Sequence, residues 1–181
     1  MIPRMTKMIY FDTDSISAFF WVKKEDLLLK LYPNRIVLPK EVYNELTNPR
    51  IPHIAARVKE LYHTGKIMVR ETLVASDEYK LYYELTEKPP PGEKRIGRGE
   101  AAAIATAAAY DGIVASNNIK DILPIINRCG VDHITTGKIL KEAMEQGLID
   151  EEEGNEIWAK MRAKKRQLPS ETFTGFLQAG F

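Results

Sequence analysis

The chain has 181 residues, of which 44% are hydrophobic and 28% charged; 26 Lys and Arg oppose 25 Asp and Glu, for a formal net charge of +1. This composition is that of a globular protein and excludes a disordered or fibrous chain. The near-neutral balance also excludes nucleic-acid binding by bulk charge alone, although a local basic groove around an acidic centre is compatible with it.

The first third of the chain alternates short apolar runs with amphipathic stretches. Lys7–Phe11 is predicted to be a strand that is buried on both faces. Ser15–Tyr32 has helical spacing, Ile36–Leu38 is a second short strand, and Lys40–Thr47 is a short helix that follows a proline. Pro52–Thr64 is the next predicted helix, and a glycine ends it.

The middle of the chain contains a third strand at Lys66–Val69 and a helix at Ser76–Thr86, whose first residue is a typical cap. Lys88–Gly99 holds three prolines, three glycines and four basic residues, and it is predicted to be an irregular loop. Glu100–Tyr110 follows as a strong helix, because seven of its eleven residues are alanine.

The last third supplies two more strands and three helices. Ile113–Ser116 and His133–Thr135 are the predicted strands, and Asn117–Asn127 is a helix between them. Thr136–Gln146 and Glu151–Arg166 are further helices. Five short strands separated by helices predict a parallel sheet that is covered on both faces.

Residues 1–140 are expected to form this α/β domain, and residues 141–181 a helical extension packed on it. Within the extension, Lys160–Arg166 is either an ordinary solvated helix end or an RNA-contacting basic face. The tail, Gln167–Phe181, mixes polar and aromatic residues. Phe173, Phe176 and Leu177 are expected to fold back on the domain or to dock on a second subunit or a regulatory partner.

Several kinds of site are excluded by simple counts. Cys129 is the only cysteine, so there is no intrachain disulfide and no cysteine-based zinc site. The three histidines are scattered without metal-ligand spacing. Asp12 interrupts the first apolar run, and Ala101–Ala109 is too short to span a bilayer, so we expect a cytoplasmic protein with no membrane partner.

Polar residues follow the first and fourth predicted strands directly. Asp12 follows the first strand, and Asn117, Asn118 and Asp121 follow the fourth. Ligand sites in open α/β sheets form at the carboxyl ends of strands, near the point where the strand order reverses. These side chains are therefore expected to flank one crevice.

Two further acids, Glu45 and Glu100, lie on predicted helices that flank the same crevice. Carboxylates that converge there repel one another, and Mg²⁺ or Mn²⁺ would remove that repulsion. Such a centre suits phosphodiester hydrolysis by a metal-activated water. Taken singly, each acid has an ordinary alternative: Asp12 as a helix cap, Glu45 as a solvated surface residue, and Glu100 as a partner of the helix dipole.

Four segments together resemble the PIN domain family. Tyr10–Asp14 (YFDTD) resembles the pattern of an aspartate directly after the first strand, and Ile36–Leu46 (IVLPKEVYNEL) resembles the pattern that carries a second acid. Gly99–Ala105 (GEAAAIA) fits the third pattern and is the most specific. In the fourth, Val114–Asn118 (VASNN), amides replace both candidate acids of the family pattern.

The resemblance, from about Lys7 to Thr136, implies a three-layer α/β/α fold with a central parallel sheet. It also implies a metal-dependent ribonuclease that prefers single strands, as in VapC-like toxins. Asp12, Glu45 and Glu100 carry over as metal ligands and catalytic residues. Asn117 and Asn118 would be uncharged ligands, and Asp121 either replaces the missing acid or caps the helix.

Basic residues near the strand ends are candidates for phosphate contacts. These are Arg98, next to Glu100, together with Lys40 and Lys120; the alternative is ordinary solvated charge. The predicted partners are RNA, an antitoxin or regulatory protein, and a second copy of the chain. The alternative function is a PIN-fold nucleic-acid-binding or regulatory module that has lost catalysis, which the Asn117-Asn118 pair supports.

Two other classes of α/β protein fit less well. A phospho-receiver domain needs an aspartate after the third strand, and Met68–Glu71 has none. A dinucleotide-binding domain needs a glycine-rich turn after the first strand, and the chain lacks it there.

Overall fold

The computed structural model describes residues 6–180, so the first five residues of the chain and the last residue of its tail lie outside the described part. The strands are β1 (Ile9–Phe11), β2 (Ile36–Pro39), β3 (Met68–Arg70), β4 (Ile113–Ala115) and β5 (Asp132–Ile134). They form one sheet in the order β3-β2-β1-β4-β5, and all four pairings are parallel. The predicted three-layer α/β/α fold with five short parallel strands is confirmed.

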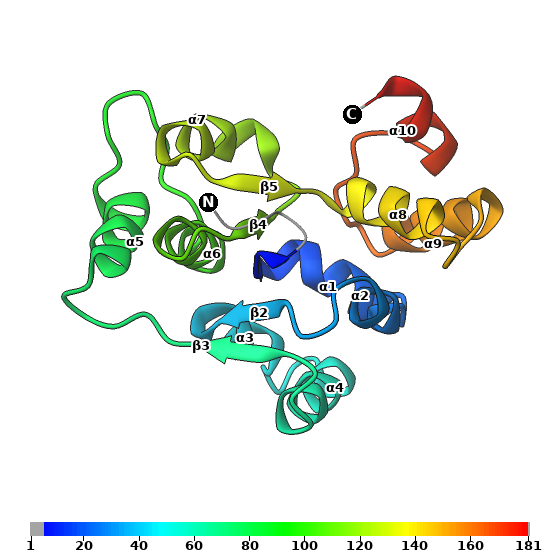
Figure 1. Cartoon of the computed structure of the whole chain (residues 1–181), viewed down its shortest axis with the longest axis horizontal. Coiled ribbons are helices and arrows are strands. Elements are labelled where there is room, and N and C mark those ends of the chain that lie inside the picture. The colour runs from blue at the N-terminus through cyan, green and yellow to red at the C-terminus, as the bar shows by residue number, and fades with distance from the viewer. Residues whose placement is uncertain (1–5, 181) are drawn as a thin grey trace.

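Helices cover both faces of this sheet (Figure 1). They are α1 (Thr13–Trp21), α2 (Glu25–Leu31), α3 (Lys40–Leu46), α4 (Pro52–His63), α5 (Asp77–Glu87), α6 (Arg98–Ala109), α7 (Ile119–Cys129), α8 (Thr136–Glu145), α9 (Glu151–Ala163) and α10 (Phe173–Ala179). None of the described helices combines the length and apolar character needed to cross a membrane.

Strand residues alternate between two hydrophobic cores. Ile9 and Phe11 of β1 face a larger core that is shared with α1, α2, α4, α8, α9 and α10. Tyr10, between them, faces a smaller core that is shared with α5, α6 and α7. Because successive strand side chains point to opposite faces, a strand with both faces covered is apolar throughout. This is why the central strands appear in the sequence as uninterrupted apolar runs.

The prediction of one helix over Ser15–Tyr32 was wrong, because two helices occupy this stretch. α1 ends at Trp21 and α2 begins at Glu25. Lys23 between them is left-handed, with φ 56°. The amide of Lys24 donates to the carbonyl of Phe19 over 2.9 Å, which closes the end of α1. Glycine usually takes this position, so a lysine there gives no signal of a helix end.

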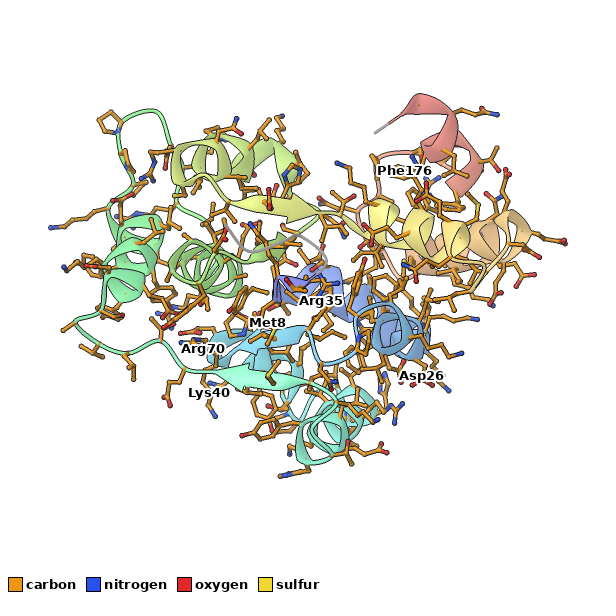
Figure 2. The ribbon with its side chains drawn as sticks, viewed as in Figure 1. Met8, Asp26, Arg35, Lys40, Arg70 and Phe176 are labelled. Carbon is orange, nitrogen blue, oxygen red and sulfur yellow. The ribbon has the colours of Figure 1, made fainter. Side chains whose placement is uncertain are left out.

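The tail forms a helix, α10, that the sequence analysis did not predict. Phe173 and Phe176 are both buried, and each packs against a glycine of a neighbouring helix. A Cβ atom on Gly154 of α9 would lie 2.4 Å from the Phe173 ring, and one on Gly137 of α8 would lie 2.6 Å from the Phe176 ring. Figure 2 shows Phe176 between α10 and α8. Of the expected docking sites for this tail, folding back on the domain is the one observed.

Gly154→Ala should destabilise the fold, although alanine is the better helix former. The added methyl group would overlap the Phe173 ring, and overpacking of this kind costs about 1–3 kcal/mol. Glu156→Ala, an exposed change on the same helix, should stay within about 0.5 kcal/mol of wild type. Chemical denaturation measures both values. Equal stability of the two variants would show that α10 does not pack tightly on α9.

Candidate active site

The strand order reverses at β1, so the carboxyl ends of β1 and β4 border the position where α/β sheets form their sites. A pocket of about 510 Å³ lies there. Its walls come from the starts of α1, α6 and α7, from α3, and from the segment that follows α9. The residues that line it are Asp12, Thr13, Asp14, Glu45, Gly97, Arg98, Gly99, Glu100, Asn118, Asp121, Lys165 and Gln167.

Asp12 is the N-cap of α1 and also a wall of the pocket. Its Oδ1 accepts a hydrogen bond from the amide of Ser15 over 2.7 Å, and the residue is only 4% exposed. Burial raises the pKa of Asp12, although hydrogen bonds with Ser116 and Ser15 oppose the rise. The capping role and a role in the site are therefore compatible, because the cap leaves the second carboxylate oxygen for other partners.

Glu100 lies in the first turn of α6 and faces the same pocket. Its Oε1 accepts from the Ser116 hydroxyl over 3.2 Å, and its Oε2 accepts from the Asn118 amide over 3.4 Å. Burial, and next the negative charge of Asp12, raise the pKa of Glu100 to about 7. Two desolvated carboxyl groups thus repel each other here, and part of the Glu100 population is protonated at neutral pH.

Glu45 comes from α3 and is more exposed than the other two acids. The Thr13 hydroxyl donates to its Oε2 over 2.5 Å, so the start of α1 orients this carboxylate. Gly99 allows α6 to approach both residues: a Cβ atom there would lie 2.7 Å from the Thr13 hydroxyl oxygen and 3.5 Å from Glu45 Oε1. The glycine that precedes Glu100 in the sequence is therefore required by the close approach of α6 to α1 and α3.

The two asparagines after β4 have different surroundings. Asn118 lines the pocket and donates to Glu100. Asn117 faces away from the acids, since its Nδ2 donates to the Thr136 hydroxyl and its Oδ1 accepts from the Thr136 amide, both over 2.9 Å. Asn117 thereby joins the end of β4 to the start of α8, and the structure does not bring it to the other candidate ligands.

Some of the remaining predicted residues line the acidic pocket and others do not. Asp121 lines the pocket and forms a long ion pair of 3.8 Å with Lys94, and Arg98 lines the pocket too. Lys40 lies over the Tyr43 ring, with its Nζ 5.2 Å from the centroid, and it does not line the pocket. Lys120 lines a neighbouring pocket instead. Of the three basic residues predicted to contact phosphates, the structure places only Arg98 at the acids.

The sequence analysis named Lys160–Arg166 as a possible RNA-contacting face, but it did not place the segment after α9 beside the acids. Lys165 and Gln167 line the acidic pocket, and Arg166 pairs with Asp14 over 2.8 Å. Lys165 adopts a left-handed backbone with φ 58°. The basic run that ends at Arg166 was the available signal, but nothing in the sequence indicates that the chain turns back there to reach α1.

The oxygen atoms that line the pocket are suitable ligands for a hard divalent cation. Carboxylate and amide oxygens line the pocket, and its described lining includes no histidine or cysteine. The mutual repulsion of Asp12 and Glu100 is what a cation would relieve. Across residues 6–180, however, no three or more His, Cys, Asp or Glu side chains are already gathered around one point as a metal site.

Replacing Gly99 with alanine should destabilise the protein by about 1–2 kcal/mol, because the new methyl group would collide with Thr13. Gly97→Ser is the matched control: a Cβ at Gly97 has no atom within 4 Å, and serine is at least as good as glycine at a helix N-cap. Thermal unfolding compares the two. If both variants unfold at the same temperature, α6 does not need the close approach.

Glu100 should make the metal-free protein less stable as pH rises. The pKa of Glu100 is about 7 in the folded protein and 4.5 in its ordinary environment, so the folded state holds this proton more tightly. The stabilising effect is complete below pH 4.5 and is lost as pH rises to 7.

Glu100→Gln removes this dependence. In EDTA, the stability of the variant relative to wild type should therefore improve by about 2 kcal/mol between pH 5 and pH 8. Urea denaturation at both values measures the difference. A difference that does not change with pH would mean that Glu100 is not desolvated.

The chain resembles proteins that are already known. One chain of the VapBC-1 structure from nontypeable Haemophilus influenzae is similar to this one, with a TM-score of 0.48 and 16% sequence identity over 71% of this chain and 98% of that one. No curated protein matches in sequence. The family model DUF3368, described as a PIN domain, matches residues 8–180, which include α8, α9 and α10. The chain therefore belongs to the PIN domain family.

Proposed function

We propose that this protein is a metal-dependent endoribonuclease that hydrolyses phosphodiester bonds of RNA at the pocket of Asp12, Glu45 and Glu100. The observation that carries the proposal is the buried Asp12 carboxyl group beside the half-buried Glu100 carboxyl group at the switch point of the sheet, where burial and the charge of Asp12 raise the pKa of Glu100 to about 7. Perturbed acids in a pocket are typical of functional sites. PIN domains are generally nucleases, which agrees with this chemistry.

Mg²⁺ or Mn²⁺ would be held by Asp12 and Glu100, with Glu45, Asn118 and Asp121 as further oxygen donors. The cation would supply charge that offsets both the carboxylates and the phosphate, and it would activate water. Asp12 is fixed for this role by its bond to the Ser15 amide, and Glu45 by its bond to Thr13.

Two free cations stand beside the acids to receive RNA phosphates. Arg98 and Lys165 line the pocket, and neither forms an ion pair with another described residue. Phosphate contacts of this kind position a nucleic acid without reading its sequence.

The competing function is a module that binds RNA without cutting it. Its support is Asn118, which donates a hydrogen bond to Glu100 where the family pattern has an acid, so one negative charge is missing from the site. Asn118 also lessens the repulsion around Glu100, which is an advantage for a pocket that holds its shape without metal.

Cleavage of a single-stranded oligoribonucleotide in Mn²⁺ tests the proposal. Glu100→Gln should lower the rate by at least about 100-fold, because it removes a charged ligand of the cation. Lys141→Ala, an exposed change away from the pocket, should leave the rate unchanged. Asn118→Asp should raise the apparent affinity for Mn²⁺, since it restores the fourth acid.

A second measurement does not depend on activity. Millimolar Mn²⁺ should raise the melting temperature of wild type more than that of Glu100→Gln, because only binding to the folded site stabilises it. If wild type and Glu100→Gln are equally inactive while both bind RNA, the binding-module function replaces the enzyme.

The partner predictions stay predictions. An antitoxin, another regulatory protein or a second copy of the chain would each increase the mass of the particle in solution. Light scattering of the isolated protein measures the last of these directly.

A further inference from the structure

A second pocket, of about 420 Å³, lies beside the acidic one. The starts of α7 and α8, the end of β5, the segment after α9 and the inner face of α10 enclose it. Figure 1 shows α7 and α10 on either side of the carboxyl end of β5. The residues that line it are Asn117, Ile119, Lys120, His133, Thr135, Lys138, Gln167, Leu168, Pro169 and Phe176. Its volume is within the range of about 300–1,000 Å³ for ligand sites.

The chemistry of this pocket is opposite to that of its neighbour. Its described lining contains no carboxylate, whereas five aspartates and glutamates line the first pocket: Asp12, Asp14, Glu45, Glu100 and Asp121. Lys120 and Lys138 stand at it, and neither is in an ion pair with another described side chain. Ile119, Leu168 and Phe176 supply apolar wall. Uncompensated cations beside an apolar wall suit a ligand that has a flat apolar part and an anionic part.

The two pockets are neighbours that share a wall. Gln167 lines both of them. The turn after β4 separates them: Asn118 and Asp121 face the acids, while Asn117 and Lys120 face the second pocket. A chain with a phosphate at every repeat could therefore place one phosphate at the acids and the next unit in the second pocket.

We infer that the second pocket binds one nucleotide of a single-stranded RNA, next to the phosphate at the acidic pocket; this inference rests on the proposed function. Lys120 and Lys138 bind the phosphate of that nucleotide, and its base lies against Ile119 and Leu168. A base can enter only when it is not paired in a duplex, and single-stranded RNA is commonly held by such apolar and stacking contacts. The pocket therefore selects unpaired RNA.

The test uses the full chain in EDTA, so that no divalent cation draws a phosphate to the acidic pocket. Adenosine 5′-monophosphate, cytidine 5′-monophosphate and inorganic phosphate are titrated and followed by amide and methyl NMR spectra. Both nucleotides should shift the signals of Ile119, Lys138 and Leu168. Inorganic phosphate should bind at least about fivefold more weakly, because it has no base for the apolar wall.

Two double variants distinguish binding in the pocket from non-specific attraction to positive charge. The double change Lys120→Ala with Lys138→Ala should weaken nucleotide binding by at least about tenfold. Lys59→Ala with Lys141→Ala changes the net charge equally, at exposed positions on α4 and α8 outside both pockets, and should have no effect. Leu168→Ala should weaken nucleotide binding and leave phosphate binding unchanged.

Three outcomes would overturn the inference: equal binding of phosphate and nucleotides, equal loss in both double variants, or shifts only at residues outside the pocket. The proposed function fails separately. Absence of Mn²⁺-dependent cleavage with nucleotide still bound in the pocket would reject the nuclease and keep the subsite. Cleavage with no nucleotide in the pocket would reject the subsite alone.

Discussion

The site depends on one constraint: two partly desolvated carboxyl groups are held next to each other. Asp12 is fixed by the cap of α1, and Glu100 by the first turn of α6. α6 can come this close only because Gly99 has no side chain to meet Thr13. The result is a pair whose charge is costly to desolvate and whose pKa values rise. The other groups described below offset the negative charge of this pair by donating hydrogen bonds.

The neighbouring groups moderate the charge by hydrogen bonds and position. Ser116 and Asn118 donate to Glu100, and Thr13 donates to Glu45. An aspartate in place of Asn118 would turn one of these donors into another repelling charge. The Asn118 side chain therefore favours an ordered pocket in the absence of metal. It also removes a negative charge that would attract a cation. Whether the pocket still binds a cation without that charge decides between a nuclease and a binding module.

The C-terminal helices shape the site from the other side. Phe173 and Phe176 anchor α10 on Gly154 and Gly137, and their rings join the same core as Trp158. Between α9 and the anchored α10, the chain passes the carboxyl ends of the strands. There it places Lys165 and Gln167 at the acids and Leu168 in the second pocket. The extension is thus part of the site, and both pockets depend on its packing.

The sequence by itself determined the sheet and the core of the acidic pocket. Apolar runs such as Ile9–Phe11 are read directly, because a strand covered on both faces is apolar at every position. Asp12 and Glu100 were predicted from local signals, a strand end and a helix start, and Glu45 from the helix that follows the second strand and from the family pattern. The different directions of Asn117 and Asn118 were decided only by tertiary structure, since Thr136, which holds Asn117, lies 19 residues away.

The same reason explains α10, Lys165 and the second pocket. α10 is stabilised by aromatic rings that fit against distant glycines, and a short segment has no local pattern that reports such a fit. Lys165 reaches the acids only because the chain reverses after α9. Local spacing therefore determined which residues could do chemistry, and long-range packing decided which of them share a pocket.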